Sequence, residues 1–166
     1  SPESIAQAKS IWKGLDNLHF EVSDMKDFKK ANTLFDTIVF PDVLEHIPVE
    51  DHFALFKTIK KHSHSGTIVF IHIPAPRFLE WMIANEPEKL QVIDQPLDTG
   101  ELVSNLSAND FYLDKMETYG LFYKEKDYQY FVFKKKQAIQ TTKHRDKWSI
   151  FKERVWIKLQ QKLPTF

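Results

Sequence analysis

Three residues with chemically active side chains follow one short apolar run of the sequence. Residues 38–40 read Ile-Val-Phe, which is typical of a buried strand and too short for a buried helix. Pro41 ends the run, because proline has no N–H to donate to a sheet ladder, and Asp42, Glu45 and His46 come soon after it. In an open α/β sheet, residues just beyond the carboxyl end of a strand line the ligand crevice. The sequence therefore predicts that these polar side chains lie at the mouth of a binding site.

Two histidines are the candidate catalytic residues of this site. Imidazole changes charge near neutral pH, so His46 can act as a general base, and together with Glu45 it can contact the substrate. His72, near the end of the next apolar run, is the second candidate. The alternative is structural. Glu45 is then an acidic residue at a helix start, and both histidines are hydrogen-bonded within the fold.

A metal site is not expected. His62 and His64 have a spacing that can mimic a pair of metal ligands, but no third ligand accompanies them. The chain has no cysteine, so thiolate metal sites, disulfides and cysteine nucleophiles are excluded.

The residues around these candidates predict an alternation of strands and helices. Residues 35–40 and 67–73 form apolar runs, as expected of parallel strands covered on both faces. Residues 49–62, between the two runs, have the apolar spacing of a helix. Before them, residues 1–15 predict a helix and residues 18–22 a short strand. This order is typical of an α/β fold.

The last part of the predicted sheet is antiparallel. Residues 107–119 predict a helix, with Ser107 as its N-cap and Gly120 at its carboxyl end. Two aromatic-rich strands follow at 121–126 and 128–135, separated by a single residue. Because so short a connection cannot cross over to a parallel strand, these two strands predict a hairpin.

The stretch at 35–47, Phe-Asp-Thr-Ile-Val-Phe-Pro-Asp-Val-Leu-Glu-His-Ile, resembles the fourth motif of the class I S-adenosylmethionine-dependent methyltransferases, in their small-molecule branch. Near the start, Ser-Pro-x-x-Ile-x-x-Ala-Lys resembles the helix after the second strand of that family. The resemblance covers about residues 1–135. It implies a partial Rossmann-like sheet that ends in an antiparallel hairpin, S-adenosyl-L-methionine as cofactor, and methylation of an oxygen or nitrogen atom of a small molecule.

The resemblance also implies roles for five cofactor-binding residues. Asp24 would accept a hydrogen bond from the adenine amino group, and the backbone N–H of Met25 would contact the ring. The alternative for Asp24 is that it caps a turn. Phe40, Pro41 and Asp42 fall where the family's backbone meets the methionyl portion of the cofactor.

One part of the family pattern is missing. The chain holds four glycines, and no two are close enough for the Gly-x-Gly turn that cradles the methionine part of the cofactor. We therefore expect a methyltransferase that lacks its N-terminal glycine-loop unit and is inactive alone, with a non-catalytic interaction or oligomerisation module as the alternative. The family's strand order, 3-2-1-4-5-7-6, would leave the outer edge of strand 35–40 without its usual neighbour. We expect a different neighbour there, from this chain or a second copy.

The charge distribution separates a body from a tail. Residues 1–133 carry 13 basic and 21 acidic side chains, whereas residues 134–166 carry 10 basic and 2 acidic ones. The acidic body argues against nucleic-acid binding, and the absence of a signal peptide or long apolar stretch predicts a cytoplasmic protein. We expect residues 1–136 to be a partial methyltransferase domain and 137–166 a basic amphipathic extension.

The extension predicts one amphipathic helix over 143–163, with apolar residues at helical spacing among Lys and Arg. Packing on the acidic body or on a second chain is the expected role, which makes self-association a prediction. The alternative is contact with a membrane surface, with tryptophans at the depth of the lipid headgroups.

Overall fold

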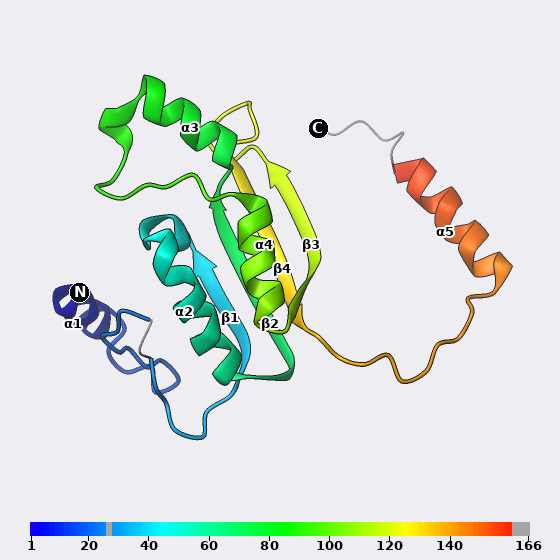
Figure 1. Cartoon of the computed structure of the whole chain (residues 1–166), viewed down its shortest axis with the longest axis horizontal. Helices are drawn as coiled ribbons and strands as arrows, with labels where there is room; N and C mark the ends of the chain where they lie inside the picture. The colour runs from blue at the N-terminus through cyan, green and yellow to red at the C-terminus, as the bar shows by residue number, and fades with distance from the viewer. Residues whose placement is uncertain (26–27, 161–166) are drawn as a thin grey trace. The chain divides into compact units, whose positions relative to one another are not determined.

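The computed structural model describes residues 1–25 and 28–160 (Figure 1). The chain divides into two compact units, Ser1–Lys136 and Gln137–Phe166. Within the described part, no helix has the length and apolar character needed to span a bilayer.

The first unit is built on one four-stranded sheet. Its strands are β1 (Phe35–Pro41), β2 (Ser63–Pro74), β3 (Phe111–Tyr119) and β4 (Tyr128–Lys135), and their order is β1-β2-β4-β3. β1 and β2 are parallel, and β4 is antiparallel to both β2 and β3. This order corresponds to the last four strands, 4-5-7-6, of the predicted sheet. The predicted partial Rossmann-like fold with a terminal antiparallel hairpin is confirmed.

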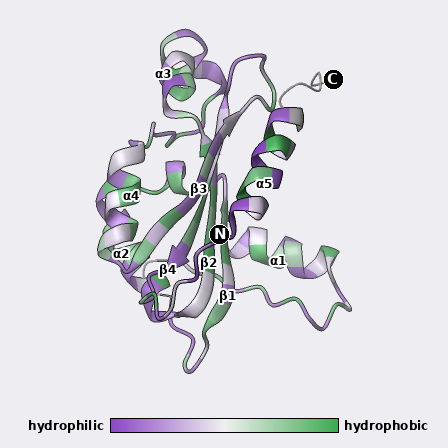
Figure 2. Ribbon diagram, turned by 90° about the vertical axis from the view of Figure 1, so that its right-hand side faces the viewer, coloured by the Kyte–Doolittle hydropathy of each residue, from purple (hydrophilic) through white to green (hydrophobic). Residues whose placement is uncertain are grey.

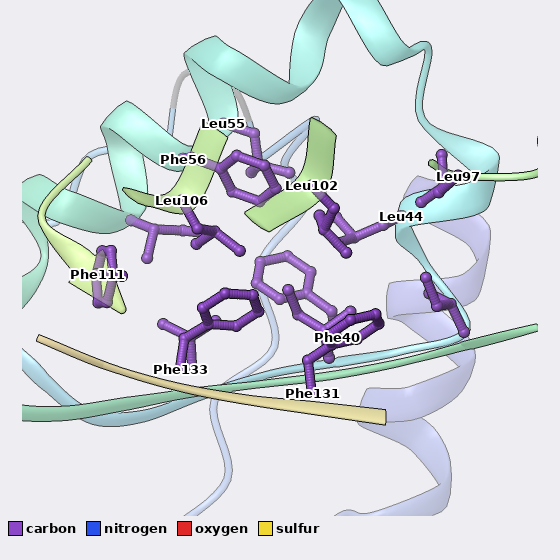
Figure 3. Packing of buried hydrophobic residues seen from close by; sticks show 14 residues of the cluster. Phe40, Leu44, Leu55, Phe56, Leu97, Leu102, Leu106, Phe111, Phe131 and Phe133 are labelled. Atoms are coloured by element: carbon purple, nitrogen blue, oxygen red, sulfur yellow. The ribbon is translucent and has the colours of Figure 1, made fainter. Parts of the chain in front are cut away.

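Helices α2 (Val49–Lys61) and α4 (Thr99–Ala108) cover one face of the sheet (Figures 1 and 3). Phe131 and Phe133 of β4 stack at 6.0 Å between ring centroids and point toward these helices. The buried cluster on this face also contains the following side chains: Phe40, Leu44, Leu55, Phe56, Ile59, Val69, Ile71, Ile73, Leu97, Leu102, Leu106 and Phe111. Burial of these side chains is what fixes β1 and β2 beneath α2.

The other helices are α1 (Pro2–Ile11), α3 (Pro76–Asn85) and two single 3-10 turns, η1 (Leu44–His46) and η2 (Pro87–Lys89). Ser1 caps α1, because its side chain accepts the N–H of Ser4. The second unit contains α5 (Lys147–Gln160), along which hydrophobic and hydrophilic residues are mixed (Figure 2). Its exposed apolar side chains are Trp148, Phe151, Val155, Trp156 and Ile157.

The predicted helix over 107–119 is wrong. The helix α4 ends at Ala108 and is capped by Asp98, whose side chain accepts the N–H of Glu101. Asp110 then adopts a positive φ of 66°, which turns the chain into β3. The fully buried ring of Phe111 and eight residue pairs with β4 outweigh the weak capping signal at Ser107. Strand formation here is a tertiary effect.

The hairpin consequently uses a different first strand from the one predicted. β3 pairs with β4, whereas residues 121–126 form the loop between them. The Asp127 carboxylate accepts the N–H of Leu121 at 2.6 Å and of Phe122 at 2.9 Å, which satisfies the backbone of this loop without a strand partner.

The predicted strand over 18–22 is also wrong, since these residues form no strand. Alternating side chains alone do not make a strand when no neighbouring ladder is available. Among the described residues, β1 pairs with β2 alone, so its outer edge has no strand neighbour from this chain. The expected neighbour from the same chain is therefore not found, and pairing with a second copy stays a prediction.

Candidate functional site

A cavity of about 460 Å³, hereafter the acidic cavity, opens at the carboxyl end of the sheet. It is lined by residues from the ends of β1, β2 and β4, from α3, and from the loops that follow. Its lining residues are Asp42, Glu45, His46, Pro74, Phe78, Leu79, Met82, Lys89, Leu90, Gln91, Asp94, Phe122, Tyr123, Asp127 and Tyr128. The structure thus brings together the three polar residues that the sequence places after the first buried strand.

The chain turns sharply at the end of β1. Asp42 has a positive φ of 50°, and its N–H donates to the carbonyl oxygen of His72 at 2.9 Å, which ties this turn to β2. The 3-10 turn η1 follows, and its fully buried Leu44 anchors it to the core. This anchoring directs Glu45 inward, so that only 1% of its surface is exposed to solvent.

Glu45 is an exceptional carboxyl group in this cavity. Its Oε2 atom is buried and has no hydrogen-bond partner among the residues that the structure describes. Burial raises the pKa of Glu45 to about 7, against the effects of its own backbone N–H and of His46, which lower it. Asp42 and Asp94 raise the pKa further by repulsion. Glu45 is therefore poised between its acid and carboxylate forms near neutral pH.

His46 is oriented by the loop that follows η2. Its Nδ1 lies 2.6 Å from the carbonyl oxygen of Ile93 and 3.5 Å from Oδ1 of Asp94. Since a carbonyl can accept but not donate, the Nδ1 carries the proton. In the neutral ring, Nε2 then carries the lone pair, and this atom lies 3.8 Å from Oε1 of Glu45. The same loop is held to η1 by the Gln95 N–H, which donates to the Glu45 carbonyl oxygen at 3.1 Å.

His72 lies beside the acidic cavity on the sheet face opposite α2 and α4. Its Nδ1 lies 3.1 Å from Oδ1 of Asp42, and its Nε2 lies 2.6 Å from the Tyr119 hydroxyl oxygen. The imidazole also stacks on the ring of Tyr128 at 4.7 Å. Burial raises the pKa of Tyr128 to about 12, and the negative charges of Asp42 and Glu45 raise it further. Both tyrosines therefore stay protonated.

Sequence reasoning missed Tyr119, Tyr128, Asp94 and Asp127. The alternation of aromatic residues in 128–133 was a usable signal for one aromatic face on β4. Tyr119 was hidden by the wrong helix prediction over 107–119. The two aspartates lie in loops whose path the sequence does not specify.

Asp24 and Met25 lie outside the acidic cavity. The Met25 N–H, predicted to contact adenine, donates to the Ser23 hydroxyl oxygen at 2.9 Å, and Met25 has a positive φ of 67°. Its side chain lines a smaller apolar cavity of about 200 Å³, together with Phe40 and residues of α2. Phe40 is otherwise part of the core, and Pro41 is the last residue of β1.

The two histidines with metal-like spacing serve separate structural roles. His62 contacts the carbonyl oxygens of Thr33 and Phe28, whereas His64 Nε2 lies 2.8 Å from Oδ1 of Asp36. Within the described ranges, no group of three or more His, Asp or Glu side chains is arranged to hold a metal ion.

Several solved structures share this fold at low sequence identity. The chain is similar to the PH0226 protein from Pyrococcus horikoshii, with a TM-score of 0.66 and 16% identity over 82% of this chain and 68% of that chain. It is similar to the N-methyltransferase NodS from Bradyrhizobium japonicum (TM-score 0.62, 14% identity, 82% and 70% covered). It is also similar to an S-adenosylmethionine-dependent methyltransferase from Clostridium acetobutylicum (TM-score 0.65, 13% identity, 81% and 72% covered).

No curated protein matches the sequence significantly. A sequence family described as a methyltransferase domain, however, matches residues 1–121, which is most of the chain. The strand order and the acidic turn after β1 agree with that match. The chain belongs to the methyltransferase domain family, as a class I S-adenosylmethionine-dependent methyltransferase.

Proposed function

We propose that this chain carries the acceptor-binding part of a methyltransferase that acts on an oxygen or nitrogen atom of a small molecule. The observation that supports this proposal is the acidic cavity, which gathers Asp42, Glu45 and His46 at the carboxyl end of β1. In this proposal, residues 1–136 are a partial methyltransferase domain and residues 137–166 a basic amphipathic extension. A cytoplasmic location is part of the same proposal.

The described residues fit one part of S-adenosylmethionine, the cofactor of the family. Phe40, Pro41 and Asp42 would hold its methionyl portion at the carboxyl end of β1. The chain has no Gly-x-Gly turn for the charged end of that portion. Asp24 and Met25 are the proposed adenine contacts, although the Met25 N–H is already donated to Ser23. When bound, the cofactor supplies an electrophilic methyl group.

The chain's own residues would orient the acceptor and take up its proton. His46 lines the cavity, and because its Nδ1–H is donated to the carbonyl oxygen of Ile93, the neutral ring offers the lone pair of Nε2. His46 is therefore the proposed general base, and Glu45 the neighbouring group that contacts the acceptor. His72 is bonded on both ring nitrogens, to Asp42 and Tyr119, so its proposed role is to position Asp42.

Calorimetric titration with S-adenosylmethionine and S-adenosylhomocysteine tests how far the chain provides the cofactor site. We expect weak binding or none, because the glycine turn is missing. Micromolar binding by the 166-residue chain would show that this expectation is wrong. Transfer of a labelled methyl group to a panel of amines and phenols tests catalysis, and the loss of transfer in His46→Ala but not in the control His64→Ala would support the assigned base.

The second candidate function is a non-catalytic oligomerisation module. It is favoured by the outer edge of β1, which has no strand neighbour among the described residues. Sedimentation equilibrium distinguishes the two candidates. A stable dimer that binds none of the amines or phenols would favour the module, and a monomer that binds one of them would exclude it.

A further inference from the structure

We propose that the acidic cavity binds its small molecule through a primary amine, with Oε2 of Glu45 as the atom that receives the amine's N–H. This inference rests on the proposed function and narrows the acceptor from oxygen or nitrogen to nitrogen. It is carried by three features of the cavity: an unpartnered buried oxygen, an excess of carboxylates, and a lining of aromatic rings.

The unpartnered oxygen calls for a donor from outside the chain. Glu45 Oε2 is buried in the lining of the cavity and accepts no hydrogen bond from any residue that the structure describes. A buried acceptor without a partner costs about 1–3 kcal/mol, so such atoms are rare in folded proteins. An ionised carboxylate can only accept. A ligand that fills this position must therefore bring an N–H or O–H group.

The charges of the cavity select a cation. Four carboxylates line it, from Asp42, Glu45, Asp94 and Asp127. The one lysine in the lining, Lys89, has its Nζ 2.8 Å from Oε2 of Glu86 and is already neutralised. An anionic ligand would meet repulsion here, whereas an ammonium group gains attraction from several sides.

Three of those carboxylates already have partners inside the protein. Asp127 accepts two loop N–H groups, Asp94 accepts the N–H of Gln91 at 2.8 Å, and Asp42 lies 3.1 Å from His72. Glu45 is left as the carboxylate with a buried oxygen that has no partner among the described residues. This division of roles places the amine at Glu45 rather than elsewhere in the cavity.

The aromatic lining suits the same ligand. Phe78, Phe122, Tyr123 and Tyr128 contribute rings to the cavity wall. Aromatic faces attract cations by roughly 0.5–2 kcal/mol per favourable contact, and they also cover the carbon skeleton of an aryl or alkyl amine. A neutral alcohol of the same shape would gain the apolar contacts and lose both the cation–π and the carboxylate attraction.

Binding of the amine should depend on pH. An alkyl ammonium stays charged between pH 6 and pH 8, whereas Glu45 ionises near pH 7. The groups that face or line the same space are His46, Asp42, Asp94, Asp127, Lys89 and Tyr128. Because the ionised fraction of Glu45 rises about tenfold over that range, affinity should rise by up to about tenfold.

The test is an NMR titration of the full 166-residue chain with phenethylamine and with its isostere 2-phenylethanol, at pH 6 and pH 8. We expect the amine to bind at least tenfold more tightly than the alcohol at pH 8, and to weaken at pH 6. Glu45→Gln should reduce both the amine preference and its pH dependence, and Glu88→Gln, the same change at an exposed glutamate, should reduce neither.

Equal affinity for the amine and the alcohol, or no binding of the amine at millimolar concentration, would overturn the inference from the unmodified chain alone. An undiminished amine preference at pH 8 in a folded Glu45→Gln protein would overturn it as well. Cofactor titration and labelled methyl transfer, measured separately, test the proposed function, so the two can fail independently.

Discussion

The hydroxyl oxygen of Tyr119 lies 2.6 Å from Nε2 of His72 and joins the carboxyl ends of β3 and β2. Since a carboxylate can only accept, Nδ1 of His72 carries the proton that faces Oδ1 of Asp42 at 3.1 Å, and Nε2 of the neutral ring accepts the hydroxyl hydrogen of Tyr119. Asp42 and Tyr119 together therefore fix the tautomer of the histidine that holds the turn after β1. This link runs from a strand late in the chain to the first residue of the acidic cavity.

Replacing Tyr119 with Phe should lower the free energy of unfolding by about 0.5–1.5 kcal/mol, the net contribution of one hydrogen bond. In the unmodified chain, long-range ¹H–¹⁵N correlation of His72 should show a proton on Nδ1 and a bare Nε2. Tyr112→Phe, at an exposed position of the same strand, serves as the control and should leave stability unchanged. A proton on Nε2 of His72 in the unmodified chain would contradict the assignment.

Glu45→Gln should stabilise the protein in a pH-dependent way. The pKa of Glu45 is raised from 4.5 to about 7 by burial, so the folded state holds its proton more tightly than the unfolded state does. The contribution of Glu45 to the free energy of unfolding is then most favourable below pH 4.5, and it is lost as the pH rises through about 7. At pH 8, Glu45→Gln should raise the free energy of unfolding by about 1–3 kcal/mol, and at pH 4 by nearly nothing.

Urea denaturation of both proteins at the two pH values checks this prediction. A stabilisation that is the same at pH 4 and pH 8 would show that removal of the charge is not its cause.

Phe56→Ala should be among the most destabilising single substitutions in α2. The Phe56 side chain is fully buried between α2 and the sheet, and removal of such a ring costs about 3–5 kcal/mol through lost burial and a residual cavity. Phe53→Ala is the matched control in the same helix, since Phe53 is 54% exposed. Chemical denaturation should separate the two variants clearly. Similar losses of stability would mean that Phe56 is not part of the core as described.

Helix α5 should bury its apolar residues on protein rather than lipid. Trp148 and Phe151 stack at 5.5 Å, and Trp156 lies further along the same helix. Flotation with anionic vesicles at low and high salt tests the alternative, in which α5 binds a membrane surface. We expect no co-flotation of the chain at either salt concentration. Salt-sensitive flotation that disappears in a Trp148→Ala, Trp156→Ala double variant would assign α5 to a membrane surface instead.

The sequence was informative where the local pattern of side chains agrees with their burial in the folded protein. The apolar runs at 35–40 and 67–73 become β1 and β2, and residues 49–62 closely match α2, whose apolar spacing reports its buried face. The same agreement allowed Asp42, Glu45 and His46 to be placed together at one strand end. The expectation that both faces of β1 and β2 are covered is wrong, since Val39 is 53% exposed and only alternate residues of β2 are buried.

The sequence pattern was misleading where partners far along the chain decide whether a segment forms a strand. Residues 111–119 carry charges at 114, 115 and 117 that read as a helix surface, yet pairing with β4 makes them a strand with one exposed face. Residues 18–22 show the converse, since a strand-like pattern stays irregular without a ladder. The partners of His72 could not be predicted for the same reason, because Tyr119 is 47 positions away.

The position of β4 has a consequence for synthesis. β4 is the last strand of the described residues but lies inside the sheet, between β2 and β3. On the ribosome, β1 and β2 can pair as soon as both have emerged, but β3 has no neighbour until β4 arrives between it and β2. The sheet can therefore close only after Lys135 has left the exit tunnel, so the nascent protein carries an incomplete sheet until that point.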